Sequence, residues 1–369
     1  GRGRLTWEVE AFAREAANGK QGRDAVEAVY TAVMKRLSGR DAGLAGSAAQ
    51  SLALDRGSRL WTMKTALEAI GLPTRIAAVR TFSTDAGENV LPDDGLLSYV
   101  GLRVELPEKK VLWLDTATRF APFGELPEQA RGREAWLFPE PGRPLTKVTT
   151  PATGEASPKQ VELELTLSPD GALTGVGVER FTGFEAAQLN EGLEDLSPDQ
   201  RQQALQSALS RFYGGAELEK LDLTLQSEVG GELSIRYQFK APRFARAEGE
   251  KLVFGALGYP EMLGRRYVQR GRRDTPLYIG RTERSITRVK LKLPKGYSLN
   301  GPIGEVKIAD DFGQFVRRER QDGDTLLVEE EFLLDMARIP TAQYEKFGHF
   351  AGQVDLLQTR DLLLEKRGL

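Results

Sequence analysis

The sequence of 369 residues contains no cysteine and a single histidine, His349. Without cysteine the chain can form no disulfide framework and can use no thiolate nucleophile. Histidine is the side chain that most often serves as a general base near neutral pH, so imidazole catalysis would rest on this one residue. A zinc site needs three or four donors, which one histidine cannot supply alone. We therefore interpret His349 as a surface residue and expect no cofactor.

The sequence also lacks long apolar runs and an excess of either charge. No stretch of eighteen or more apolar residues is present, so we expect no transmembrane segment. The 51 basic and 53 acidic residues nearly cancel, which provides no overall field for holding nucleic acid or an anionic membrane. The abrupt start, Gly1-Arg2-Gly3-Arg4, suggests an excised fragment of a longer protein. Richness in Arg, Ala, Leu and Gly indicates a bacterial source, and we favour the periplasm or cell envelope over the cytoplasm.

The patterning predicts an α+β fold with two domains. Apolar residues recur at helical spacing between residues 26 and 37, and again from Ser58 to Ile70, where Gly71 and Pro73 follow. Short segments rich in Val, Leu and Ile then predict strands at residues 74–82, 97–106 and 111–115. Helices followed by an antiparallel sheet would form a first domain over residues 1–140.

A proline-rich stretch predicts the boundary between the domains. Residues 141–160 read as an extended linker, and residues 161–369 as a β-rich domain of the antiparallel sandwich type. Alternating strands are predicted at 161–167, 218–225, 233–239, 289–293 and 326–332. The phrase Ser197-Pro198-Asp199-Gln200 is typical of a helix start, with an N-cap, a proline at the first helical position and a capping-box Gln. It predicts one helix inserted among the strands.

Three segments of the first domain resemble landmarks of the transglutaminase-like superfamily, in the order expected for its Cys-His-Asp triad. The segment from Gly57-Ser58-Arg59 to Gly71-Leu72-Pro73-Thr74-Arg75 is similar to the nucleophile helix, with its Gly-x-Cys start. Residues 98–104 resemble the histidine strand, and Trp113-Leu114-Asp115 resembles the segment that carries the acid. Two further segments, at residues 123–133 and 339–344, extend the resemblance. They are similar to segments of large bacterial proteins in which a β-rich domain of unknown function follows the transglutaminase-like domain. The resemblance spans most of the chain and implies a papain-like fold of helices and antiparallel sheet.

The triad positions themselves have changed. The nucleophile position falls at Arg59, or at Ser58 if the register differs by one, and the histidine position falls at Tyr99. Only Asp115 keeps the residue type of the superfamily. Arg59 stays protonated and cannot act as nucleophile or base, and an ordinary phenol is a poor base at pH 7. These substitutions predict an inactive, degenerate triad.

Each of these residues has more than one interpretation. Ser58 could be a surrogate nucleophile, but serine is also a preferred N-cap, and we favour the cap. Asp115 could pair with Arg59, or with Tyr99, and so fill the groove that the lost side chains would leave.

Three hypotheses about function follow. We favour a non-catalytic binding or scaffolding module, a pseudoenzyme that recognises a protein partner of unknown identity. The second hypothesis is a residual serine hydrolase or acyltransferase using Ser58. The third is binding of an anionic polymer through the basic run from Arg265 to Arg273, although we favour a solvated loop or inter-domain salt bridges as the explanation of this run. No nucleic acid is expected as a partner.

Overall fold

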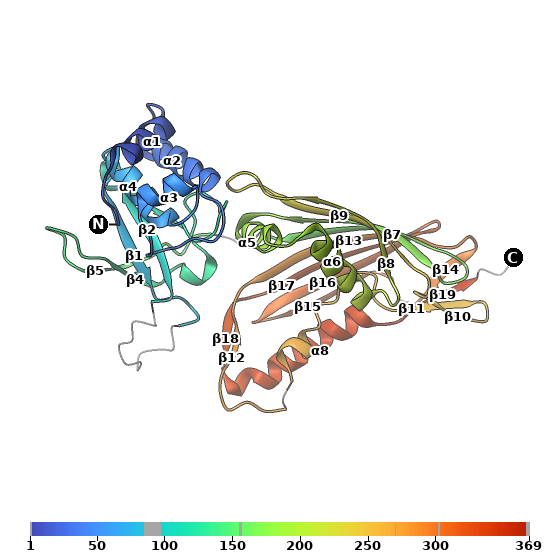
Figure 1. Ribbon diagram of the computed structural model, residues 1–369. Coiled ribbons are helices and arrows are strands. Elements are labelled where there is room, and N and C mark those ends of the chain that lie inside the picture. The colour runs from blue at the N-terminus through green and yellow to red at the C-terminus, as the bar shows by residue number, and fades with distance from the viewer. Residues whose placement is uncertain (1, 85–96, 155–156, 270, 302, 367–369) are drawn as a thin grey trace. The chain divides into compact units, whose positions relative to one another are not determined.

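The computed structural model describes residues 2–84, 97–154, 157–269, 271–301 and 303–366, which form two compact units (Figure 1). Unit 1 comprises Gly1–Ala156, Thr182–Asp195 and Leu225–Glu232. Unit 2 comprises Ser157–Phe181, Leu196–Thr224 and Leu233–Leu369. The fold is a mixture of helices and mainly antiparallel sheets, which agrees with the α+β class predicted from the sequence.

Unit 1 begins with helices and continues with a sheet, in the predicted order. Its helices are α1 (Trp7–Ala17), α2 (Gly22–Arg36), α3 (Ala48–Leu54), α4 (Arg59–Ala69) and α5 (Gly183–Glu194). Helix α4 ends where the sequence predicts, because Gly71 adopts a left-handed φ of 83° that a side chain would disfavour.

The sheet of unit 1 has five strands in the order β3-β2-β1-β4-β5, and every pairing is antiparallel. The strands are β1 (Thr74–Val79), β2 (Tyr99–Glu105), β3 (Val111–Leu114), β4 (Glu134–Leu137) and β5 (Thr146–Thr149). Strand β1 is buried along its whole length, as expected for a central strand. The order places β2 beside β3, so the start of β2 and the residue after β3 lie on neighbouring strands.

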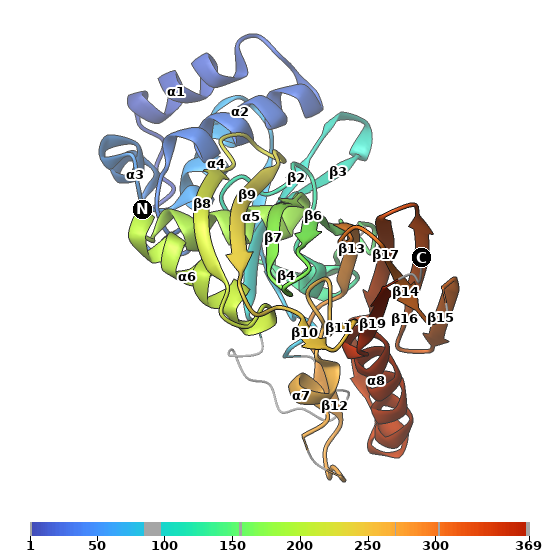
Figure 2. The ribbon, with the colours of Figure 1, turned by 90° about the vertical axis from the view of Figure 1, so that its right-hand side faces the viewer.

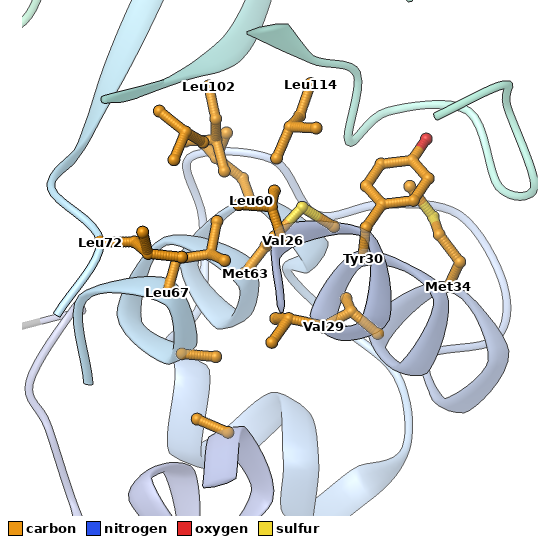
Figure 3. Packing of buried hydrophobic residues seen from close by; sticks show 14 of the residues in the cluster. Val26, Val29, Tyr30, Met34, Leu60, Met63, Leu67, Leu72, Leu102 and Leu114 are labelled. Carbon is orange, nitrogen blue, oxygen red and sulfur yellow. The ribbon is translucent and has the colours of Figure 1, made fainter. Parts of the chain in front are cut away.

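The core of unit 1 lies between the helices and the sheet. Side chains of α2 and α4 point toward Leu102 and Leu114 of the sheet (Figure 3). Tyr30 contributes its ring to this core and donates its hydroxyl to the carbonyl oxygen of Ala121 at 3.1 Å. Most of the apolar side chains predicted from helical spacing lie in this core, whereas Ile70 is only partly buried against it. The buried ones are Val26, Val29, Tyr30, Val33, Leu37, Leu60, Met63 and Leu67.

Unit 2 is built on an eight-stranded sheet in the order β15-β16-β17-β13-β6-β7-β9-β8. Strands β13 and β6 pair in parallel, and the other neighbours pair antiparallel. The bounds of the eight strands are β6 (Lys159–Leu167), β7 (Leu173–Phe181), β8 (Glu217–Thr224), β9 (Leu233–Ala241), β13 (Glu283–Lys292), β15 (Glu305–Asp310), β16 (Gly313–Asp322) and β17 (Thr325–Leu334).

Smaller sheets and helices complete unit 2. A four-stranded sheet contains β10 (Arg246–Glu248), β11 (Lys251–Phe254), β14 (Tyr297–Asn300) and β19 (Leu362–Lys366), and a two-stranded sheet contains β12 (Leu277–Ile279) and β18 (Ala337–Ile339). The helices are α6 (Pro198–Phe212), α7 (Leu263–Tyr267) and α8 (Tyr344–Thr359). Helix α6 starts with the predicted capping box and lies against β8 (Figure 2).

One face of the large sheet is apolar at both ends and polar in between. On β17, Val328 belongs to one hydrophobic cluster and Phe332 to another, and Glu330 lies between them on the same face. The neighbouring strand β16 places Arg317 opposite Glu330, and both side chains are buried. A buried charge is costly unless it is paired. The stability of this row therefore depends on the ion pairs between its side chains.

The division of the chain differs from the expected one in three respects. Within the expected linker 141–160, β5 pairs with β4 and belongs to unit 1. Two helices, not one, lie between β7 and β8, and the first of them, α5, packs with unit 1 together with Leu225–Glu232. The expected antiparallel sandwich is one large sheet with a parallel pair at its centre, because β13 adds beside β6 after a long excursion of the chain.

Candidate functional site

Ser58 is the N-cap of α4, and its hydroxyl is fully engaged. The side chain accepts a hydrogen bond from the backbone N–H of Trp61 at 3.0 Å and donates one to the carbonyl oxygen of Gly43 at 2.6 Å. Ser58 is completely buried. A nucleophilic serine needs a base to take its proton, and a backbone carbonyl cannot serve as one. The geometry is that of a cap.

Arg59 is the first residue of α4, and its guanidinium is only 1% exposed. It donates hydrogen bonds to the carbonyl oxygens of Thr116 at 2.9 Å, Ala117 at 2.6 Å and Gly39 at 2.9 Å. These carbonyls belong to the loop that follows β3 and to the loop that follows α2. The planar, five-donor guanidinium suits such a set of acceptors, and Arg59 thereby joins two loops to the start of the helix.

Two acidic residues from other parts of unit 1 complete the environment of Arg59. Glu191 of α5 places Oε1 3.3 Å from the guanidinium and also accepts the backbone N–H of Arg119 at 2.8 Å. Asp41 accepts the backbone N–H of Arg59 at 2.7 Å, which satisfies one of the free donors at the start of α4. Burial raises the pKa of Asp41 to about 6, and the nearby Arg59 opposes that rise.

Tyr99 and Asp115 meet across the neighbouring strands β2 and β3. The Tyr99 hydroxyl donates to Asp115 Oδ1 at 2.8 Å, and the carboxylate also accepts the backbone N–H groups of Ala117 at 3.2 Å and Thr118 at 3.0 Å. Asp115 is completely buried. Its carboxylate therefore has the partners that a buried charge needs.

The electrostatics exclude Tyr99 as a base. Burial, the negative charge of Asp115 and the hydrogen bond to that carboxylate together raise the pKa of Tyr99 well above its ordinary value. Burial also raises the pKa of Asp115, while its hydrogen bonds from Tyr99 and the backbone oppose the rise. The phenol stays protonated and acts as a hydrogen-bond donor, so Tyr99 does not act as a proton acceptor.

The structure brings the four positions together around one helix start, and of the two partners predicted for Asp115 it pairs Tyr99 with the carboxylate. Among the described residues the ion-pair partner of Arg59 is Glu191, and Asp115 is paired with Tyr99 instead. Sequence reasoning missed Glu191 and Asp41. Asp41 stands in the turn Gly39-Arg40-Asp41, a typical acceptor context, but nothing local indicates which helix it caps.

Asp115→Ala should lower the free energy of unfolding of unit 1 by about 1–3 kcal/mol, because it leaves a buried hydroxyl and two backbone donors without their acceptor. Unfolding by urea, followed by tryptophan fluorescence, measures the effect, since Trp113 lies two residues away. Tyr99→Phe removes only one of the three bonds and should cost less. An unchanged midpoint for Asp115→Ala would show that the carboxylate contributes nothing to stability.

The other residues singled out from the sequence do not join this site. His349 lies on α8 of unit 2 with 78% of its side chain exposed, and its nearest acid is Glu345 at 4.0 Å. Within the basic run, Arg266 pairs with Glu283 and Glu261, and Arg273 donates to the carbonyl of Thr275. Arg270 lies outside the described residues.

Neither a metal-binding group nor a membrane-spanning helix is found among the residues that the structure describes. No group of three or more His, Asp or Glu side chains there is arranged to hold a metal ion. Likewise, none of the helices in those ranges is both long enough and apolar enough to cross a membrane.

Comparisons with known proteins add a fold and a domain family. Residues 259–364 match the family DUF3858, described as a domain of unknown function with a solved structure. The whole fold is similar to the crystal structure of a protein from Parabacteroides distasonis described as a "putative protease", with a TM-score of 0.52 and 13% sequence identity. The match covers 97% of this chain and 55% of that one, so this chain spans about half of its length. At this identity the likeness shows the fold alone. The search of curated proteins found no match.

Proposed function

We propose that unit 1 is a transglutaminase-like domain without catalytic activity, and that the chain acts as a binding or scaffolding module in a bacterial envelope-associated or multiprotein system. The observation that carries this proposal is the occupation of the triad positions. Ser58, Arg59, Tyr99 and Asp115 are all buried or nearly so, and each directs its polar atoms at partners within unit 1. None of these four side chains offers an unengaged proton acceptor.

The competing hypothesis of a serine hydrolase finds less support. The Ser58 hydroxyl points its proton at a carbonyl oxygen, and the side chain is 0% exposed. The one histidine belongs to unit 2 and is a helix-surface residue. Although the similar protein from Parabacteroides distasonis is described as a "putative protease", the likeness is one of fold, and protease chemistry on this chain would need a nucleophile and base that these positions do not offer.

The purified chain should show no amidase, transamidase or esterase activity above background, and Ser58→Ala should behave like the parent in each assay. Model peptide amides, a glutamine-donor amine-incorporation assay and a chromogenic ester cover the three reaction types. Labelling with a serine-directed fluorophosphonate, followed by mass spectrometry, tests Ser58 directly. Stoichiometric labelling of Ser58 that the Ser58→Ala variant abolishes would replace the scaffold proposal by the hydrolase.

The proposed protein partner is tested separately. The intact chain is cross-linked in its native cell and recovered, and the attached proteins are identified by mass spectrometry. A reproducible partner that purifies in a defined ratio with the chain supports a scaffolding role. Recovery of the chain without any stoichiometric partner would count against it.

A further inference from the structure

A second concave site lies in unit 1, beside α3. It is a cavity of about 540 Å³, which lies within the range of small-molecule sites. It is formed by the loops before and after α3 together with α3 itself. The lining residues that determine its chemistry are Arg40, Gln50, Ser51, Leu54, Arg56 and Gly57.

The charge of this cavity is entirely positive. Arg40 and Arg56 both line it, and no acidic side chain does. Both arginines are exposed, and among the described residues neither forms an ion pair or a side-chain hydrogen bond. The two adjacent acids in the sequence have other partners, because Asp55 is paired with Arg36 at 2.8 Å and Asp41 accepts the backbone N–H of Arg59 at 2.7 Å. Two guanidiniums therefore face the cavity without a protein counter-charge.

The remaining lining fits a ligand with one polar end. Gln50 is exposed at the rim and offers an amide, and the glycines bring backbone close to the cavity. Gly57 has a φ of 132°, and a Cβ there would lie 2.6 Å from the Ser51 hydroxyl oxygen, so the close backbone approach requires glycine. Leu54, which is 54% exposed, gives one apolar wall.

We propose that this cavity binds a small phosphate monoester, with Arg40 and Arg56 holding the phosphate and Leu54 contacting the attached organic group. A phosphate monoester carries a charge of about −2 at pH 7.5, which matches the two uncompensated guanidiniums. Arginine forks bind phosphate oxygens in a bidentate manner, and the charge-assisted bonds are stronger than neutral ones. A carboxylate would compensate only one of the two charges. This inference does not depend on the loss of catalysis, because its residues are separate from the four triad positions.

Phenyl phosphate is the probe, and benzoate is its carboxylate counterpart. Isothermal titration of the intact chain at low ionic strength and pH 7.5 should show saturable binding of phenyl phosphate that is tighter than that of benzoate. The double variant R40Q/R56Q should bind phenyl phosphate roughly tenfold or more weakly. The matched control R4Q/R14Q removes the same charge from two exposed arginines outside the cavity and should bind like the parent.

The outcomes separate a built site from general electrostatic attraction. Equal weakening in both double variants, tighter binding of benzoate, or no saturable binding of phenyl phosphate by the parent would each overturn the proposal. Arg40 and Arg56 are exposed and unpaired, and Arg14 has only an exposed ion pair with Glu10, so both double variants are expected to keep nearly the parent's melting temperature. If a variant fails to fold, the comparison of phenyl phosphate with benzoate on the parent chain still tests the proposal.

Discussion

Replacing Arg59 with methionine should lower the free energy of unfolding of unit 1 by about 3–5 kcal/mol. Methionine keeps much of the length of the side chain, so the main change is the loss of the donors. The buried carbonyl oxygen of Thr116 and the partly buried ones of Ala117 and Gly39 would then lose their donor, and an unpaired buried carbonyl has a cost. For a unit of this size the corresponding fall in melting temperature is roughly 6–20 °C.

The sequence provides the probe for this measurement. The four tryptophans, at positions 7, 61, 113 and 136, all belong to unit 1, so intrinsic fluorescence reports its unfolding separately from that of unit 2. Arg40→Met is the matched control, because this exposed arginine stands in the same loop region without an ion pair and its replacement should leave the midpoint nearly unchanged. If Arg59→Met had the same urea midpoint as the parent, the hydrogen bonds of the guanidinium to the two loops would contribute nothing to the stability of unit 1.

Much of the local structure could be predicted because its signals are local. The capping box at Ser197 and Gln200 marks the start of α6, and the cap, apolar stripe and closing Gly71 mark α4. Alternation of apolar and polar residues likewise locates β6 and β17. These features depend on interactions between residues only a few positions apart in the sequence. Such interactions form independently of the rest of the fold.

The missing parts depend on contacts between distant residues. Helix α5 was not predicted, because its buried positions are Ala186, Ala187 and Asn190, which give no clear apolar stripe, and its N-cap makes no side-chain hydrogen bond. Its Glu191 reaches Arg59, 132 residues earlier in the sequence. No local pattern indicates such a pair.

The candidate site shows the same division. The resemblance to the transglutaminase-like superfamily implied that Ser58, Arg59, Tyr99 and Asp115 lie near one another, and the structure brings them to one helix start. Which of them pair is decided by side-chain reach. Asp115 lies within reach of the Tyr99 hydroxyl from the neighbouring strand, whereas the guanidinium of Arg59 turns toward backbone carbonyls.

The second large effect is expected in unit 2, at the row of buried ions on the large sheet. Arg317 donates to Glu319 Oε1 at 2.7 Å and to Glu330 Oε1 at 2.5 Å, and all three side chains are less than 10% exposed. Gln358 of α8 also donates to Glu330 at 3.3 Å, and Arg360 donates to Glu319. The row thus joins the sheet to the C-terminal helix by charge-assisted bonds.

Arg317→Met should therefore lower the free energy of unfolding of unit 2 by about 3–5 kcal/mol at pH 7, because it leaves two buried carboxylates with less compensation. The loss should depend on pH. Burial already raises the pKa of Glu330, and removal of the neighbouring cation would raise it further. A carboxyl whose folded pKa exceeds its unfolded value binds more protons when folded, so stability falls as pH rises. The variant should thus be closer to the parent at pH 5 than at pH 8.

Unit 2 has no tryptophan, so its unfolding in urea is followed by circular dichroism of the intact chain at both pH values, with the fluorescence of unit 1 as an internal reference. Arg318→Met is the matched control. It removes the same charge from the next residue of β16, but its side chain is 43% exposed and its ion pairs with Glu305, Glu329 and Glu331 are solvated, so little change is expected. The triple variant R317M/E319Q/E330Q removes the stranded charges and should regain part of the loss. Equal effects of Arg317→Met and Arg318→Met, or a loss independent of pH, would mean that the buried row contributes no more than an exposed ion pair.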